Sequence, residues 1–228
     1  MAKNKKKAEE THTSIDTLND SLTSLPAKLK ESRKIITIAS IVVIVIVAAI
    51  LFYLFGIRQP GINKANENIG LADRELIVNG NDSLALDLYL KTAENGYDAG
   101  NRARLQAAII LYNQGKYQEA LNAVKDYSAN DAIIGAAAYS LKGDCYVMLD
   151  KLPDAVSAFK DAIDQSDDNT YYTPLFMMKL ARVYEAQKNY AEAEKLYQKI
   201  IDEFPVYSRD INASVEKHLE RAKLMQQK

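Results

Sequence analysis

Small and apolar residues alternate with polar ones in a pattern that recurs three times in the C-terminal half of the chain. The three copies read GKYQEAL, DKLPDAV and KNYAEAE, and each places an alanine three residues after a tyrosine or leucine. A period of about 34 residues is typical of stacked pairs of helices, and Ala120, Ala155 and Ala193 lie 35 and 38 residues apart. The pattern therefore predicts an all-α fold. The predicted pairs span residues 101–127, 137–165 and 174–204.

The first helix of each predicted pair carries a small residue three positions before a larger apolar one. These sets are Ala108 with Leu111, Gly143 with Tyr146 and Ala181 with Tyr184. A small side chain lets two helix backbones approach closely, and the larger side chains fill the grooves that remain. Because a single pair cannot bury its apolar face alone, the copies are expected to stack into an α-solenoid.

Further helices are predicted on both sides of the three clear pairs. Residues 63–78 and 82–95 read as a first, degenerate pair, with Asp82 as the expected N-cap of its second helix. Residues 208–227 read as a charged final helix, and a polar cap is what the open end of such an array needs. The predicted domain therefore covers residues 63–228, with about four helical pairs and a C-terminal capping helix.

Local signals mark the ends of the helices in the last pair. Thr173 and Pro174 are expected as the N-cap and the first helical residue of its first helix. Asn189 and Glu192 have the spacing of a capping box at the start of its second helix. Pro205 is expected to end that helix, because proline cannot continue it.

An apolar run near the N-terminus predicts a single transmembrane helix. Residues 35–55 contain no charged side chain, and 15 of these 21 residues are Ile, Val, Leu or Phe. A helix of this length spans roughly 32 Å, close to the ~30 Å hydrocarbon core of a bilayer. The apolar stretch of a cleaved signal peptide is shorter, at about 7–15 residues, and ends in small residues. This run ends in bulky aromatics, so an uncleaved anchor is expected.

Positive charge is concentrated on the N-terminal side of this run. Four Lys or Arg residues lie within residues 28–34, whereas only Arg58 and Lys64 follow the run closely. Since an excess of Lys and Arg keeps a flank in the cytoplasm, the N-terminus is predicted to be cytoplasmic. The helical pairs are then expected on the far side of the membrane.

The residues next to the apolar run are predicted to be a tail and a hinge. Residues 1–34 form a charged tail with one short amphipathic segment, for which a lipid surface, a partner protein and an unstructured tail all stay open. Its apolar stripe consists of Ile15, Leu18, Leu22, Leu25 and Leu29. Residues 56–62 (GIRQPGI) contain two glycines and a proline, so a hinge is expected there.

The charge balance argues against nucleic-acid binding. Residues 1–34 carry eight Lys or Arg against five Asp or Glu, and residues 56–228 carry 21 against 25. The part expected to fold therefore has no basic excess, which a nucleic-acid-binding surface would need. Proteins and the membrane remain as the expected partners.

The sequence gives little support for catalysis, a cofactor or a metal. The single cysteine, Cys145, cannot form a disulfide within the chain and is expected to be buried as a small packing residue. His12 falls in the tail, and His218 is expected to be solvated on the final helix. The acidic run at residues 164–168 lacks the glycine and glutamate of a calcium loop, so a polar turn is expected. No phosphate-binding glycine motif is present.

The repeated segments at residues 99–121, 141–163 and 171–205 resemble tetratricopeptide repeats. The order of charged tail, single anchor and repeat domain resembles the YfgM-like bacterial inner-membrane proteins, and more closely their Bacteroidota relatives. This resemblance covers most of residues 65–225. It implies a periplasmic repeat domain beside the Sec translocon that cooperates with a membrane-anchored periplasmic chaperone of the prolyl-isomerase type and acts on unfolded or peptide clients.

The resemblance also implies a groove for partner binding. In tetratricopeptide arrays the first helix of each pair lines the concave face, where an amphipathic or extended peptide is bound. Transferred to this sequence, the main groove residues are Leu105, Ile109, Tyr112, Val147, Met148, Met178 and Arg182. Ser140, Asp144 and Glu185 fall on the same faces. A core role for such a stripe of Met and Ile is the alternative.

Three kinds of protein fit these features. The leading hypothesis is a membrane-anchored adaptor that acts beside the translocon. An assembly scaffold of another cell-envelope complex is the second. A receptor of an organelle outer membrane, with its repeats in the cytosol, is the third, although the flanking lysines disfavour that orientation.

Overall fold

The computed structural model describes residues 33, 35–94, 98–210 and 215–227. Every regular element in these ranges is helical, which confirms the all-α prediction. The chain divides into two compact units, residues 1–60 and 61–228, which are described separately below. The predicted amphipathic stripe from Ile15 to Leu29 lies outside the described residues.

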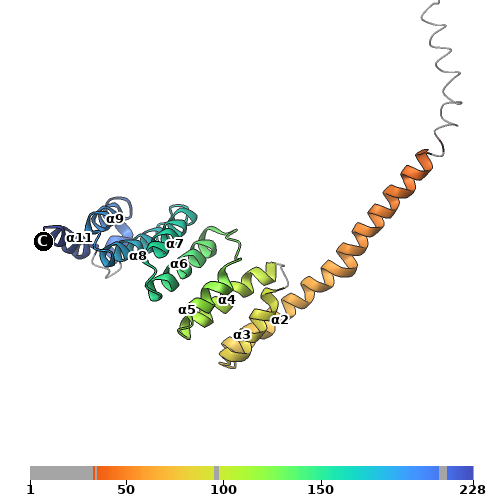
Figure 1. Ribbon diagram of the computed structural model, residues 1–228, viewed down its shortest axis with the longest axis horizontal. Helices are drawn as coiled ribbons and strands as arrows, with labels where there is room; N and C mark the ends of the chain where they lie inside the picture. Colours follow the sequence, from red (N-terminus) through yellow and green to blue (C-terminus); the bar gives the residue numbers. More distant parts are fainter. Residues whose placement is uncertain (1–32, 34, 95–97, 211–214, 228) are drawn as a thin grey trace, which may run out of the picture. The chain divides into compact units, whose positions relative to one another are not determined.

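The second unit consists of consecutive helical pairs, visible as successive hairpins in Figure 1. The pairs are α2 (Gln59–Ile77) with α3 (Asp82–Ala93), α4 (Asp98–Asn113) with α5 (Tyr117–Val124), α6 (Ala132–Met148) with α7 (Leu152–Gln165), and α8 (Tyr172–Ala186) with α9 (Tyr190–Glu203). Two further helices follow, α10 (Pro205–Asp210) and α11 (Val215–Gln226). The prediction of about four pairs and a capping helix is therefore confirmed.

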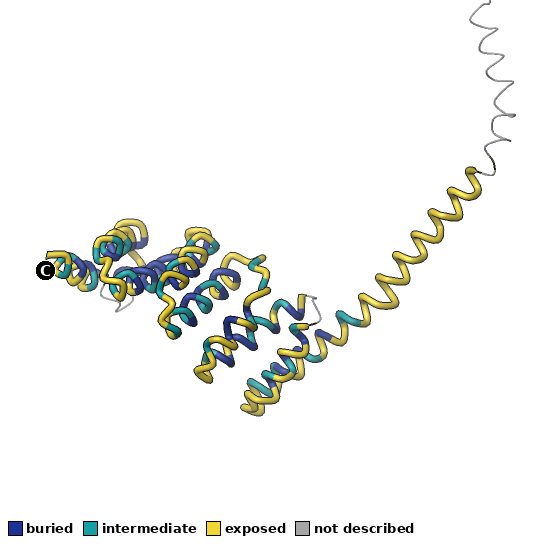
Figure 2. The backbone as a smooth tube through the Cα atoms, in the orientation of Figure 1, coloured by how far each residue is buried: buried dark blue, intermediate teal, exposed yellow. Residues whose placement is uncertain are grey.

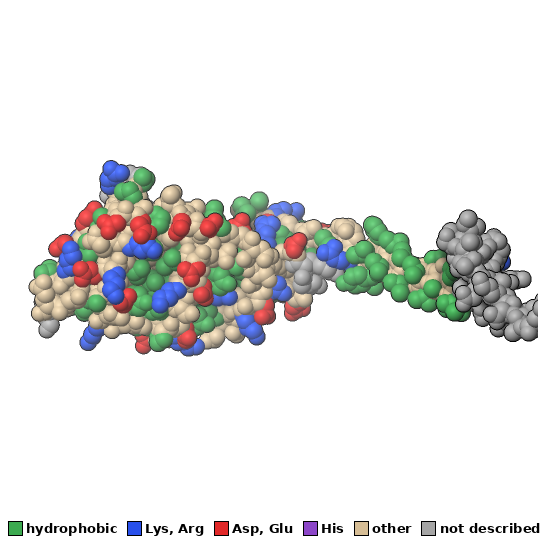
Figure 3. Space-filling model, turned by 90° about the horizontal axis from the view of Figure 1, so that it is seen from above, with side chains coloured by type: hydrophobic (Ala, Val, Ile, Leu, Met, Phe, Trp, Pro, Cys, Tyr) green, Lys and Arg blue, Asp and Glu red, His purple; other side chains and the backbone are tan. Residues whose placement is uncertain are grey.

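The first unit contains the apolar helix. A helix that begins at Ile35 is long and apolar enough to cross a membrane, with a mean hydropathy of 3.3 in its most apolar window and none of that window buried. Its residues are exposed along the whole run (Figure 2), and hydrophobic side chains cover much of its surface in Figure 3. Length and composition thus agree with the predicted transmembrane segment.

Residues 56–62, where a hinge is predicted, are helical. A π-helix, η1, covers Phe52–Arg58, and α2 begins at Gln59. Pro60 has no backbone N–H to donate to a carbonyl four residues earlier. The π-helix has a different hydrogen-bond pattern next to this proline. Here the Gln59 N–H donates to the Leu54 carbonyl, which lies five residues earlier. A proline is accommodated here by a change of helix type.

Close packing within the pairs depends on small residues, as predicted. Ala108, Ala120, Ala155, Ala181 and Ala193 are all fully buried. Gly143 in α6 faces the Phe159 ring of α7 so closely that a Cβ atom there would lie 2.7 Å from the ring carbons. Figure 2 shows the resulting buried stripe along the facing sides of the helices. The buried clusters follow one another along the array, as expected for stacked repeats.

The turn inside each of the last three pairs has the same backbone structure. Gly115, Asp150 and Lys188 adopt positive φ values of 75°, 57° and 59° directly after α4, α6 and α8. In each turn the next residue donates its N–H to a carbonyl five positions back, as Lys116 does to Leu111 at 2.9 Å. These bonds define a Schellman motif, which ends a helix with one left-handed residue. The repeated GKY, DKL and KNY segments thus encode a specific turn.

Two predicted helix starts are wrong by one or two residues. Asn81, not Asp82, caps α3, since its side chain accepts a hydrogen bond from the Leu84 N–H. Helix α8 begins at Tyr172, so Thr173 lies inside the helix, where its hydroxyl is 2.6 Å from that of Ser166. Asn169 accepts hydrogen bonds from the N–H groups of the residues that start this helix.

The predicted start of α9 is confirmed, but only half of the expected capping box forms, because the Asn189 N–H donates to the Tyr184 carbonyl. Asn189 caps α9 through a hydrogen bond from the Glu192 N–H, while the Glu192 carboxylate pairs with Lys195 at 2.6 Å. Helix α9 ends at Glu203, two residues before Pro205, which starts α10. The expected final helix over 208–227 is divided between α10 and α11, and residues 211–214 lie outside the described part.

Helix α11 packs against α9 and closes the C-terminal end of the array. His218 is half-buried in this seam and stacks on Tyr197 with the ring centroids 5.5 Å apart, so the prediction of a solvated histidine is wrong. Arg221 forms an ion pair with Glu185 of α8 across the same seam. Burial lowers the pKa of His218, and the charges of Arg221 and Arg182 lower it further.

Candidate protein-binding groove

A groove of about 270 Å³ is formed by the first helices of three consecutive pairs, α4, α6 and α8. Its apolar lining consists of Leu105, Ile109, Ala137, Leu141, Tyr172, Leu175 and Phe176. Its polar lining consists of Ser140, Asp144 and Lys179. The second helices α5, α7 and α9 do not contribute to this lining, so the groove lies on the side expected for the concave face of such an array.

Two of the seven main predicted residues line this groove. Leu105 is almost fully buried in its wall, whereas Ile109 is 37% exposed. Ser140 and Asp144, which were predicted on the same faces, also line the groove. Binding of a partner by these residues stays a prediction.

The other predicted residues lie elsewhere. Tyr112 is half-buried and packs edge-to-face on Tyr117, with the centroids 5.4 Å apart. Val147 and Met148 are exposed at the C-terminal end of α6, beyond the groove lining. Met178 is 3% exposed and belongs to the C-terminal core, so its predicted place at the binding surface is wrong.

Arg182 and Glu185 lie further along α8 than the groove lining. Arg182 is exposed, and Glu185 pairs with Arg221 of the capping helix. These two side chains therefore belong to the C-terminal seam.

The sequence predicted that α8 lines the groove through Met178 and Arg182, but it missed the residues of α8 that do so. Tyr172, Leu175, Phe176 and Lys179 follow one another at spacings of three, one and three residues, which places them on one helix face. A lysine inside the otherwise apolar run PLFMMKLA was the available signal. A charged side chain on a largely buried helix needs a partner of opposite charge or a hydrogen-bond acceptor. Lys179 therefore predicts an acidic residue nearby, and Asp144 is that residue.

An ion pair joins α6 and α8 across the groove. The Lys179 Nζ atom lies 2.6 Å from Asp144 Oδ2 and donates a second hydrogen bond to Ser140 Oγ at 3.0 Å. Burial raises the pKa of Asp144, and the ammonium of Lys179 opposes that shift. The ammonium also lies 5.8 Å from the centroid of the Phe159 ring. Two neighbouring pairs are thus tied together by a charged contact that the groove exposes to solvent.

The nearby cysteine is not suited to nucleophilic chemistry. Cys145 is fully buried, as predicted. Burial, and next the charge of Asp144, raises the pKa of its thiol to about 11. The thiolate is the reactive form, so Cys145 remains a neutral packing residue near pH 7. Within the described ranges, His, Cys, Asp and Glu side chains form no cluster of three or more that could hold a metal ion.

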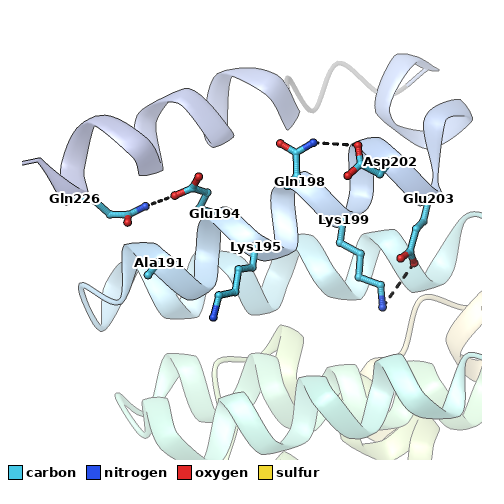
Figure 4. A pocket seen from close by; sticks show the side chains of 8 residues that line it. All are labelled: Ala191, Glu194, Lys195, Gln198, Lys199, Asp202, Glu203 and Gln226. Atoms are coloured by element: carbon cyan, nitrogen blue, oxygen red, sulfur yellow. Dashed lines mark hydrogen bonds and ion pairs between the residues drawn. The ribbon is translucent and has the colours of Figure 1, made fainter.

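A second hollow, of about 550 Å³, lies between α9 and α11 and is shown in Figure 4. Its polar side chains are largely paired with each other. Lys199 lies 3.6 Å from Glu203, Gln198 donates to Asp202 at 3.0 Å, and Gln226 donates to Glu194. Figure 4 shows these side chains spread along the outer surface of α9. This hollow is therefore a solvated charged surface, and the apolar groove is the better candidate site.

Comparison with known families supports the repeat architecture. Residues 84–185 match the family described as tetratricopeptide repeat-like domain, and residues 176–205 match the family described as tetratricopeptide repeat. A search among curated proteins finds no match.

Solved structures with a similar fold come from proteins of distant sequence. A putative kinesin light chain from Podosopora anserina with nearly identical TPR-like repeats has a TM-score of 0.55 at 16% identity, covering 72% of this chain and 87% of that one. MamA from Desulfovibrio magneticus RS-1 has a TM-score of 0.51 at 15% identity, covering 72% and 96%. At these identities the likeness concerns the fold alone. The stacked helical pairs thus have the architecture of tetratricopeptide repeats, and the two family matches together span residues 84–205.

Proposed function

We propose that this protein is a membrane-anchored scaffold that binds segments of other proteins in the groove between α4, α6 and α8, and that it is not an enzyme. The observation that carries the proposal is the groove itself. It presents an apolar surface around Ile109 on the face that such repeats use for ligands. Tetratricopeptide folds serve widely as protein-interaction modules.

The proposed location is the periplasmic face of a bacterial inner membrane. The apolar helix that starts at Ile35 supplies the anchor, and the excess of Lys and Arg before it supports a cytoplasmic N-terminus. The proposed partners are Sec translocon subunits, a membrane-anchored periplasmic chaperone and the unfolded clients that they share. This choice rests on the resemblance of the order of parts to the YfgM-like proteins.

Site-specific photo-crosslinking in cells tests the proposed partners. A photoreactive amino acid at Ile109 or Leu175 is expected to capture translocon subunits, periplasmic folding factors or secreted clients, because both side chains line the groove. The same amino acid at Lys195, in the charged hollow of α9, serves as the control. Capture of cytosolic proteins alone would contradict the periplasmic location. Identical crosslinked products from the groove positions and from Lys195 would contradict the groove as the binding site.

The substitution Ile109→Asp tests the groove as the binding surface. Placing a carboxylate among Leu105, Leu141 and Phe176 is expected to weaken partner binding at least tenfold, because an apolar ligand surface would then have to desolvate a charge. Co-purification of the full-length protein in mild detergent measures the loss. Ile134→Asp is the matched control, since Ile134 is 52% exposed on α6 and does not line the groove.

A further inference from the structure

We infer that the groove takes an extended, uncharged segment of a partner protein and that Asp144 and Lys179 together hold one of its backbone amides. The inference rests on the proposed function, because it assumes that the groove binds protein. It adds the chemical class and the conformation of the bound segment.

The ion pair in the groove leaves one donor and one acceptor unused. An ammonium carries three donors, and Lys179 uses two of them, on Asp144 Oδ2 and Ser140 Oγ. Asp144 Oδ1 makes no hydrogen bond within the described part of the chain. The two side chains are 31% and 28% exposed, so a ligand in the groove can reach both.

A neutral amide is the group that matches this arrangement. Its carbonyl accepts from the free N–H of Lys179, and its own N–H donates to the free oxygen of Asp144. A ligand carboxylate would meet the Asp144 charge, and a ligand ammonium would meet that of Lys179. The mutually neutralised pair therefore favours neither sign of charge, and the apolar walls around it favour an uncharged segment.

The bound segment must be extended for its backbone amide to be available. Inside a helix each N–H and carbonyl is already used along the helix itself, except at the ends. An extended chain instead directs alternate side chains toward one surface, where Leu175 and Phe176 would receive them.

The test uses the full-length protein in lipid nanodiscs and blocked, fluorescently labelled peptides selected on it by display from a random library. Each selected peptide is compared by fluorescence anisotropy with an analogue in which successive backbone amides are N-methylated one at a time. Methylation removes one N–H without changing any side chain. At the contacted position it is expected to weaken binding about tenfold to a hundredfold, the range for hydrogen bonds to charged groups.

The double substitution Asp144→Leu with Lys179→Met removes the pair without leaving a buried charge unpaired, which avoids the main cause of misfolding. The unmethylated peptide is expected to bind the double variant at least about tenfold more weakly than the native protein. The N-methylation that weakens binding to the native protein is expected to cause no further loss of affinity in the double variant. Lys142→Met is the matched control, because Lys142 lies on α6 outside the groove lining. Thermal unfolding of all variants verifies that the array is folded.

Three outcomes would overturn the inference: selection of helical or charged peptides, affinity that is insensitive to every backbone methylation, or dependence on a side-chain Asn or Gln amide instead. The substitution Ile109→Asp separates this failure from failure of the proposed function. One outcome is that Ile109→Asp abolishes peptide binding while the double substitution and the N-methylations leave the affinity unchanged. In that case the groove binds protein and only the proposed amide contact is wrong. If Ile109→Asp also has no effect, the groove itself is not the site.

Discussion

At the residue scale, the contact between Gly143 and Phe159 sets how closely α6 and α7 approach. Gly143→Ala is expected to destabilise the array by about 1–2 kcal/mol, because the added Cβ would lie 2.7 Å from a ring that is itself buried. Gly70→Ala is the control, since a Cβ there meets nothing within 4 Å and alanine favours a helix. Chemical denaturation of both variants measures the difference, and equal stabilisation by both would contradict the packing argument.

His218 is expected to make the stability of the C-terminal seam depend on pH. Burial lowers its pKa below the ordinary value of 6.5, and Arg221, Arg182 and Lys217 act in the same direction against Glu185. The unfolded chain therefore binds a proton more readily than the folded one. The free energy of unfolding is expected to fall as the pH drops below about 6.5.

Thermal unfolding at about pH 7.5 and about pH 5.5 measures this loss. His218→Gln, which stays neutral at both values, is expected to lose less stability than the native protein over this interval. The same loss in both proteins would assign the pH dependence to other groups.

The environments of single residues were predictable only where packing rules decide them. Cys145 was expected to be buried because it falls where a small residue is needed, and it is fully buried. His218 was expected to be solvated because its neighbours Glu216 and Lys217 are charged. Its stacking on Tyr197 depends on how α11 docks onto α9, and no local pattern contains that information.

At the element scale, the left-handed residues of the Schellman turns offer a test of helix termination. A residue with a Cβ in this conformation costs roughly 1–2 kcal/mol, a cost that glycine avoids. Asp150→Gly and Lys188→Gly are therefore each expected to stabilise the array by up to about 1 kcal/mol, and Gly115→Asp to destabilise it similarly. Denaturant unfolding of the three variants checks the sign, and a loss of stability in the glycine variants would contradict the assignment.

The docking of α11 gives a second test at this scale. Leu219→Ala is expected to cost about 2–4 kcal/mol, because Leu219 is 6% exposed in the core shared with Tyr197 and Ile200. Leu224→Ala on the same helix is the control, since Leu224 is 60% exposed.

Amide hydrogen exchange locates the effect of Leu219→Ala. Repeats of this kind contact only their neighbours, so faster exchange is expected in α9 and α11 and not in α4 and α5. Uniformly faster exchange along the array would contradict this independence.

At the scale of the whole molecule, the side of the membrane on which the repeats lie is predicted from the basic residues before the apolar helix. Protease added to spheroplasts is expected to digest the repeat domain and to spare the N-terminal tail. Replacing the four basic residues within 28–34 by glutamine is expected to protect the repeats in a fraction of the molecules, because the charge difference across the anchor is lost. Protection of the native repeats would place them in the cytosol.

The architecture was predictable to a larger extent than the groove. A period carried by Ala120, Ala155 and Ala193 fixes the helical pairs, because only small residues fit where the backbones meet. The groove depends on which sides of α4, α6 and α8 face one another, and a helical stripe of Met and Ile does not distinguish surface from core. Met178 falls in the core and Lys179 in the groove, although they are adjacent in the sequence.

The serial order of contacts predicts how the array responds to a pulling force. Each helix contacts mainly the next one along the chain, from α4 to α5, from α5 to α6 and onward. A force that pulls the two ends of the array apart therefore acts on every helix–helix interface. The seam beside α5 is the expected yielding point, because α5 has only eight residues, the fewest of the paired helices. Under tension the array would extend in steps and recoil quickly, since its contacts are local in sequence.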